Sequence, residues 1–219
     1  MKKKNNILFD VITVFPKSIE TYLNESLLLR AQNNKLINIK IHNLRDFLKS
    51  PKERIDDKPF GGGPGMVLAF EPIYKAVKKI KNKNKKNRVI LFSTRGKVYN
   101  KKEALRLTKY GQVILICGKY EGVDERVAQY IADEEISIGD FVLMGGEIPA
   151  MLLIDTMARF VPGVLGDYKS LEENKGSYPV YTRPEVIEIK EGNKKKKLIV
   201  PKVLLSGNHK EIEESREER

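Results

Sequence analysis

The 219-residue chain contains one cysteine, two histidines and no tryptophan, and the shortage of cysteine and histidine excludes whole classes of protein. The single cysteine, Cys117, rules out a disulfide framework, and its place inside an apolar run indicates a small core residue. His42 and His209 stand far apart, so the chain has neither an HExxH motif nor a Cys/His zinc site. No metal-ligating residue is therefore predicted.

Other signatures are missing as well. No GxxxxGK[ST] loop occurs, no GxGxxG follows an expected strand, and no GxSxG elbow is present. These absences disfavour a P-loop nucleotide hydrolase, a dinucleotide-dependent dehydrogenase and a serine hydrolase.

The hydrophobic segments are all short. None approaches the length of a membrane span. The basic N-terminus precedes an apolar run that is interrupted by Asp10 and lacks a small-residue cleavage site, which indicates a first strand and not a signal peptide. We therefore expect a cytoplasmic protein with no membrane partner.

Negative charge is in deficit: the formal net charge is +12 and the pI is near 9.5. This excess favours a polyanionic partner, most often nucleic acid, over a merely solvated basic surface. The lysine-rich run 78–88 fits either phosphate contact or a solvated loop, and the sequence leaves both open.

Strand-like and helix-like segments alternate along the first 160 residues. This alternation predicts an α/β fold with a mostly parallel sheet and helices on both faces. The expected strands are 7–14, 37–43, 89–93, 113–117 and 141–144, and the expected helices are 16–31, 71–80, 101–110, 124–132 and 148–160. A polar segment, 161–183, follows as a linker or lid.

Glycines gather where two of these strands end. Gly118, Gly122, Gly139, Gly145 and Gly146 adjoin the runs 113–117 and 141–144. In α/β proteins such turns present backbone groups to a ligand, so we favour a ligand site over ordinary core turns. A second glycine-rich segment, GGGPGM at 61–66, is typical of a substrate-facing loop, the alternative being a mobile connector.

Six motifs then stand in a recognisable order: GGGPGM, CGKYEGVDERV, SIGDFVLMGGEIPAM, RFVPGVLG, YTRPE and VLLSGNH. Together they resemble the bacterial tRNA (guanine-N1)-methyltransferases of the TrmD type, in the SPOUT superfamily. The resemblance runs from the first strand to His209. It implies a SPOUT fold, in which the C-terminal part of the sheet domain is tied in a trefoil knot that binds S-adenosylmethionine.

The resemblance also implies a set of binding residues. The methyl donor would be held by Leu91, Phe92, Ser93, Gly118, Tyr120, Glu121, Gly122, Ser137, Ile138, Gly139, Asp140, Phe141, Val142, Leu143, Gly145 and Gly146. The substrate loop would be Gly61, Gly62, Gly63, Pro64, Gly65 and Met66. A requirement for Mg²⁺ stays open.

The implied reaction places a methyl group on N1 of guanine 37 in tRNA, next to the anticodon. Arg159, before PGVLG, would stabilise charge on the base, the alternative being a helix-end arginine paired with Asp155. The family's general base is an aspartate, but Asn174 stands at that position here, and an amide cannot accept the proton. Glu173 is the replacement candidate.

The resemblance further implies a homodimer that binds the anticodon arm of tRNA. We expect a methyltransferase domain at 1–160, a linker or lid at 161–183, and the start of a small tRNA-binding domain at 184–219. That last part is a truncated or reduced extension, because the family pattern continues beyond SGNH. The alternatives are a knotted methyltransferase acting on another RNA position and a non-catalytic RNA-binding relative that has lost its base.

Overall fold

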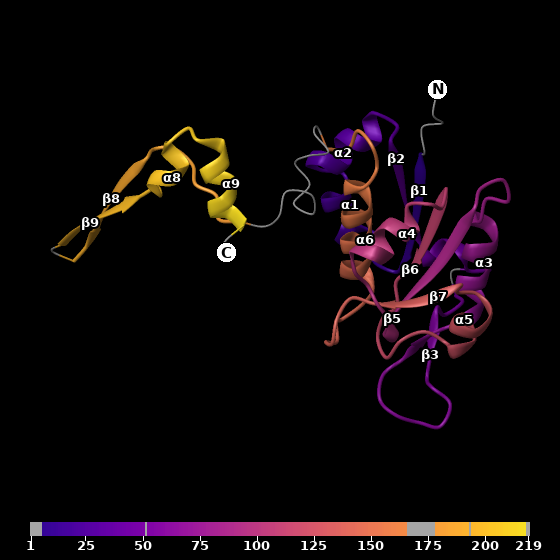
Figure 1. The fold of residues 1–219 in the computed structure, drawn as a ribbon. Helices are drawn as coiled ribbons and strands as arrows, with labels where there is room; N and C mark the ends of the chain where they lie inside the picture. Colours follow the sequence, from indigo (N-terminus) through magenta and orange to yellow (C-terminus); the bar gives the residue numbers. More distant parts are fainter. Residues whose placement is uncertain (1–5, 51, 166–177, 193, 218–219) are drawn as a thin grey trace. The chain divides into compact units, whose positions relative to one another are not determined.

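The computed structural model describes residues 6–50, 52–165, 178–192 and 194–217. The chain divides into two compact units, Met1–Tyr168 and Lys169–Arg219. Among these described residues, the first unit contains the five-stranded sheet and the helices α1 to α6, and the second contains a hairpin and two short helices (Figure 1).

A five-stranded, fully parallel sheet forms the centre of the first unit. Its strands lie in the order β2-β1-β6-β5-β7, and each neighbouring pair is parallel. Their bounds are Ile7–Thr13 for β1, Ile37–Asn43 for β2, Asn87–Val98 for β5, Gln112–Ile116 for β6 and Glu134–Ser137 for β7. All five residues of β6 are buried, as expected for a central strand covered on both faces.

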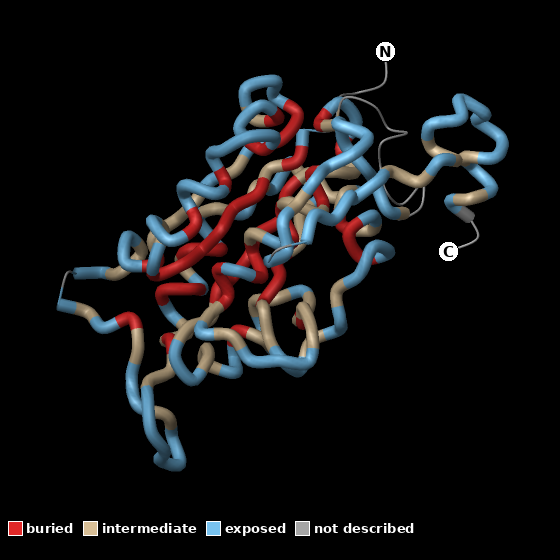
Figure 2. Tube along the Cα trace, turned by 90° about the vertical axis from the view of Figure 1, so that its left-hand side faces the viewer, coloured by how far each residue is buried: buried red, intermediate tan, exposed pale blue. Residues whose placement is uncertain are grey.

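Helices cover both faces of this sheet. One face carries α1 (Lys17–Leu23), α2 (Ser26–Asn33), α4 (Lys101–Leu107) and α6 (Glu147–Arg159). The other carries α3 (Phe70–Ile80), α5 (Glu125–Tyr130) and the 3₁₀ turn η1 (Leu44–Phe47). Two apolar cores result, and Figure 2 shows the buried residues running along the strands between the layers. The α/β fold with a mostly parallel, doubly covered sheet is confirmed.

The prediction of a strand over 141–144 was wrong. The fifth strand is β7, and residues 141–144 lie in the loop between β7 and α6. Their apolar sequence is typical of a buried strand, but Phe141, Val142 and Met144 are 55%, 84% and 90% exposed.

The true fifth strand was missed because two of its residues are acidic. Glu134 is half-buried at the sheet edge, where Arg88 and Arg106 bind its two carboxylate oxygens at 2.7 and 2.6 Å. Burial is the largest single effect and acts to raise the pKa of Glu134, but the hydrogen bonds and charges of the two guanidinium groups together hold this pKa below its ordinary value. Ion pairing thus lets charged residues occupy a strand that the hydrophobic pattern does not reveal.

The predicted helix over 16–31 is two helices. α1 ends at Leu23 and α2 begins at Ser26, whose φ of 50° lies in the left-handed region. The amides of Asn24 and Gln32 donate to the carbonyls of Glu20 and Leu23, which satisfies the end of α1.

The described residues also form two small two-stranded sheets. In the first unit β3 (Asp56–Asp57) pairs with β4 (Val67–Leu68), so the loop between them carries GGGPGM. In the second unit β8 (Val186–Glu191) pairs with β9 (Lys194–Ile199), followed by α8 (Lys202–Leu205) and α9 (His209–Glu217). Among the described residues of this second unit, none is fully buried.

The boundary of the first unit lies beyond residue 160. Val161 and Val164 are buried in the core shared by α1, α2 and α6. The described helices include none that is long and apolar enough to cross a membrane.

Candidate active site

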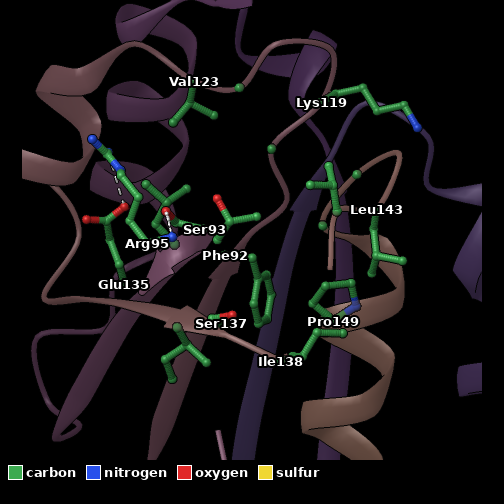
Figure 3. A pocket seen from close by; sticks show the side chains of 18 of the residues that line it. Phe92, Ser93, Arg95, Lys119, Val123, Glu135, Ser137, Ile138, Leu143 and Pro149 are labelled. Atoms are coloured by element: carbon green, nitrogen blue, oxygen red, sulfur yellow. Dashed lines mark hydrogen bonds and ion pairs between the residues drawn. The ribbon is translucent and has the colours of Figure 1, made fainter. Parts of the chain in front are cut away.

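A cavity of about 450 Å³ lies at the carboxyl ends of β5, β6 and β7. Its wall is built from the end of β5, the loop after β6, the end of β7, the loop before α6, and Pro149 of α6. Figure 3 shows side chains from these segments converging on one space. Ligands of open α/β sheets bind at this edge, because successive strand ends deliver their loops to the same place.

The structure brings nearly all of the predicted donor-binding residues to this wall. Asp140 is the exception: it is exposed and does not line the cavity. The lining residues among the predicted set are Leu91, Phe92, Ser93, Gly118, Tyr120, Glu121, Gly122, Ser137, Ile138, Gly139, Phe141, Val142, Leu143, Gly145 and Gly146. Their role in binding the donor stays a prediction, but the structure places all of them around one cavity.

Two of the wall segments are held together by main-chain contact. The N–H of Gly146 donates to the carbonyl oxygen of Gly118 at 2.9 Å, and Lys119 and Gly145 form an antiparallel bridge. A Cβ atom at Gly146 would lie 2.6 Å from Cα of Cys117, closer than packing allows. Glycine at 146 is therefore required for the loop before α6 to lie against the end of β6.

A buried polar contact anchors the same region to β1. Glu147, the first residue of α6, is almost fully buried, and the hydroxyl of Thr13 donates to its Oε1 at 2.7 Å. Cys117 is buried beside it. Burial first, and then the nearby carboxylate of Glu147, raise the pKa of the Cys117 thiol well above its ordinary value. This cysteine is therefore a neutral core residue, as its sequence context indicated.

The loop with GGGPGM reaches the rim of the cavity through its last residue. The N–H of Glu121 donates to the carbonyl of Met66 at 3.1 Å, and the N–H of Leu68 donates to the carbonyl of Gly122 at 3.0 Å. The other predicted substrate residues, Gly61, Gly62, Gly63, Pro64 and Gly65, are exposed, and none of 61–66 lines the cavity itself.

Backbone strain also gathers at this rim. Tyr120 lies in the cavity wall with a φ of 61°, in the left-handed region that residues with a side chain rarely adopt. Such strain persists only where the surroundings hold it, and it is common at binding sites.

The sequence of the chain matches a known family over almost its whole length. The sequence model of the family tRNA (Guanine-1)-methyltransferase TrmD matches residues 7–219. The chain belongs to this family.

Three relatives show the extent of the similarity. A tRNA (guanine-N(1)-)-methyltransferase of Clostridioides difficile is 44% identical over 96% of this chain and 90% of its own length. One from Dictyoglomus turgidum is 48% identical over 93% of this chain and 80% of its own length. The crystal structure of tRNA (m1G37) methyltransferase from Aquifex aeolicus is similar with a TM-score of 0.78 and 40% identity, covering 96% of this chain and 87% of that one.

Of the predicted catalytic residues, the structure describes only Arg159, and Arg159 does not line the cavity. Arg159 ends α6, ten residues after Pro149, so it lies about 15 Å along the helix from the wall. Glu173 and Asn174 lie outside the described residues. Among the residues that the structure describes, no group of three or more His, Cys, Asp or Glu side chains could hold a metal ion.

Some wall residues were not predicted. Thr94, Arg95, Lys119, Val123, Glu125, Ala128, Glu135, Ile136, Met144 and Pro149 also line the cavity. Two of these, Arg95 and Glu135, form an ion pair. The available signal for Arg95 was its position just past the expected end of the third strand.

Two glycines of the cavity wall, Gly146 and Gly118, should respond differently to substitution by alanine. We expect Gly146→Ala to lower the free energy of unfolding by about 1–3 kcal/mol, because its Cβ would overlap the backbone of Cys117. Gly118→Ala is the matched control, since its Cβ would meet only Val123, at an ordinary 3.6 Å. Urea unfolding of both variants measures the difference. Equal midpoints would show that the loop before α6 does not depend on close packing at Gly146.

Proposed function

We propose that this chain transfers the methyl group of S-adenosylmethionine to N1 of guanine 37 in tRNA. The observation that carries the proposal is the glycine-lined cavity at the sheet edge, in a chain of the TrmD family. The structural relative from Aquifex aeolicus is a tRNA (m1G37) methyltransferase. A cytoplasmic location is part of the proposal, because tRNA is modified there.

The cavity wall fits a ligand that presses against the backbone. Gly118 has no left-handed φ, and a Cβ there would have room within the protein. Folding alone therefore does not require glycine at 118. At Gly122 a Cβ would meet nothing within 4 Å, although its φ of 128° also favours glycine. An adenosine or methionine group lying against these two glycines would explain the absence of side chains.

The donor, when bound, supplies an electrophilic methyl group on a positively charged sulfur. The chain must supply the rest. Guanine N1 carries a proton at neutral pH, so a base must accept it as the methyl group arrives. A cation near O6 stabilises the charge that develops on the ring, and Arg159 is the residue proposed for this task.

Arg159 can serve such a site if two copies of the chain combine. Ile148 and Leu152 are partly exposed on α6, and the spacing 148, 152, 159 places Arg159 on the same helix face. Val142 and Met144, in the loop before α6, are also exposed. We propose that a second copy covers this apolar surface and that Arg159 of one copy completes the cavity of the other.

A complementation experiment tests this shared site. Gly118→Val should block the donor cavity and Arg159→Ala should remove the cation, so each homodimer should be nearly inactive. Co-expressed at equal levels, half of the dimers would be mixed, and each mixed dimer would hold one intact site of two. Methyl transfer should then recover to about a quarter of the parent rate. Recovery to no more than the mean of the two variants would contradict a site built from both copies.

The tRNA surface is proposed from charge and domain order. The basic run 78–88 contains Lys86, which lies 4.8 Å from the ring centroid of Tyr110, and the hairpin strand β9 begins with four lysines. We propose that these groups contact phosphates of the anticodon arm. We propose the domain division implied by the sequence, with one change: the linker to 184–219 begins after Val164, because Val164 is buried in the first unit.

Methyl transfer to a tRNA transcript tests the function directly. We expect incorporation of labelled methyl groups into an unmodified transcript with guanine at position 37, and none when adenine replaces it. Incorporation at another position would favour the alternative of a different RNA target. Binding of both tRNA and donor without transfer would favour a non-catalytic relative. A chelator in the same assay tests Mg²⁺, for which no residues are assigned.

The general base is proposed to be Glu173, next to Asn174. Glu173→Gln keeps the size and hydrogen bonding of the side chain but removes its basicity. Single-turnover transfer should therefore fall by about two orders of magnitude or more, with donor and tRNA binding retained. Asn174→Asp should raise the rate by placing a carboxylate at the family position. If neither change alters the rate, the base lies elsewhere, and Asp167 is the next residue to substitute.

A further inference from the structure

A cluster of one cation and two anions lies at one edge of the cavity. Arg95 lies two residues after Ser93 in the irregular part of β5, where the pairing with β7 shifts register between Phe92 and Lys97. Its Nη2 lies 2.7 Å from Oε2 of Glu125 and 3.5 Å from Oε1 of Glu135. All three side chains line the cavity.

The backbone fixes the position of this cluster. Gly96 lies so close to β7 that a Cβ there would be 2.6 Å from the main-chain carbon of Glu135. The bulge therefore presses β5 onto β7 immediately beside Arg95. As a result, the side chains of Arg95 and Glu135 meet at the cavity edge, as Figure 3 shows.

Glu135 has an unsatisfied oxygen. Its Oε1 is buried, and among the described residues it has no hydrogen-bond partner. Its nearest partner is Nη2 of Arg95, at an ion-pair distance of 3.5 Å, which leaves Oε1 able to accept from a further donor. A buried carboxylate oxygen without a hydrogen bond is costly, so this position favours an occupant of the cavity that donates one.

Arg95 has hydrogen-bond donors at the same edge of the cavity. Both of its ion pairs use Nη2, and a guanidinium carries three further N–H groups on Nε and Nη1. Its side chain is 64% exposed, so it can turn toward a ligand without disrupting the core. The cavity edge thus presents a negatively charged hydrogen-bond acceptor, the carboxylate of Glu135, next to positively charged donors, the N–H groups of Arg95.

We propose that Glu135 and Arg95 bind the zwitterionic amino-acid end of the methyl donor. Glu135 accepts a hydrogen bond from the ammonium group, and Arg95 donates to the carboxylate. This inference rests on the proposed function, since it assigns one end of the donor to one end of the same cavity. Both are positioning residues, because they hold the donor and do not touch the reacting atoms.

The rest of the wall supports this orientation. Ile138, Leu143 and Pro149 line the side of the cavity away from Arg95 and Glu135 (Figure 3). Those apolar side chains suit a flat adenine, whereas the charged edge suits the amino-acid end. A ribose hydroxyl could also donate a hydrogen bond to Glu135. Unlike the ammonium group, however, a hydroxyl carries no positive charge to balance that of the Glu135 carboxylate.

Three ligands and two variants test the proposal by calorimetry. S-adenosylmethionine carries both charged groups, its decarboxylated form keeps only the ammonium, and 5′-methylthioadenosine has neither. Glu135→Gln should weaken the first two by about tenfold or more and leave the third within about twofold. Arg95→Gln should weaken only the first. Arg126→Gln is the matched control: Arg126 is about as exposed as Arg95 and pairs with Asp124, but it does not line the cavity, so each affinity should change less than about threefold.

Each contrary result has a distinct meaning. If Glu135→Gln weakens 5′-methylthioadenosine as much as S-adenosylmethionine, Glu135 acts on the adenosine or on the fold, and the proposal is wrong. Unchanged binding of S-adenosylmethionine to both variants also overturns it. Failure of the parent protein to bind any of the three ligands would instead contradict the proposed function. Because Arg95 is largely exposed, Arg95→Gln keeps the test decisive even if Glu135→Gln does not fold.

Discussion

The close approach of Gly146 to the end of β6 is the contact on which the candidate site depends. The hydrogen bond from Gly146 to Gly118 joins the loop after β6 to the loop before α6, two segments separated by a strand and a helix in the sequence. Because the backbones of these two loops are in contact, the other residues of both loops lie around the cavity. The cavity exists because the chain folds back on itself at this point.

The same contact fixes where α6 begins, and this determines the layout of the whole site. The buried Glu147, bonded to Thr13, holds the first turn of α6 against β1. Since α6 is a straight run of 13 residues, its last residue is carried far from the cavity that its first turn helps to form. Donor residues and Arg159 are thus separated by helix geometry within one chain, which is the physical reason for invoking a second copy.

The sequence predicts the fold class and most of the cavity wall because the signals there are local. Glycines after apolar runs mark turns at strand ends, and such turns converge in any parallel sheet. The failures have one cause, which is that tertiary contacts override the local pattern. Phe141 and Val142 resemble a buried strand but are exposed, whereas Glu134 lies in a real strand because Arg88 and Arg106 neutralise it. Arg95 and Glu135 meet only through a bulge that no periodicity reveals.

The buried Cys117 can report on motion of the loop before α6, because it packs directly against Gly146. Cys117 is the one thiol in the sequence, and it lies beneath Gly146 with its pKa raised by burial. Separation of the loop before α6 from β6 would expose it to a thiol reagent. The rate of alkylation therefore measures the opening of this loop, without any engineered label, and a ligand that closes the cavity should slow it.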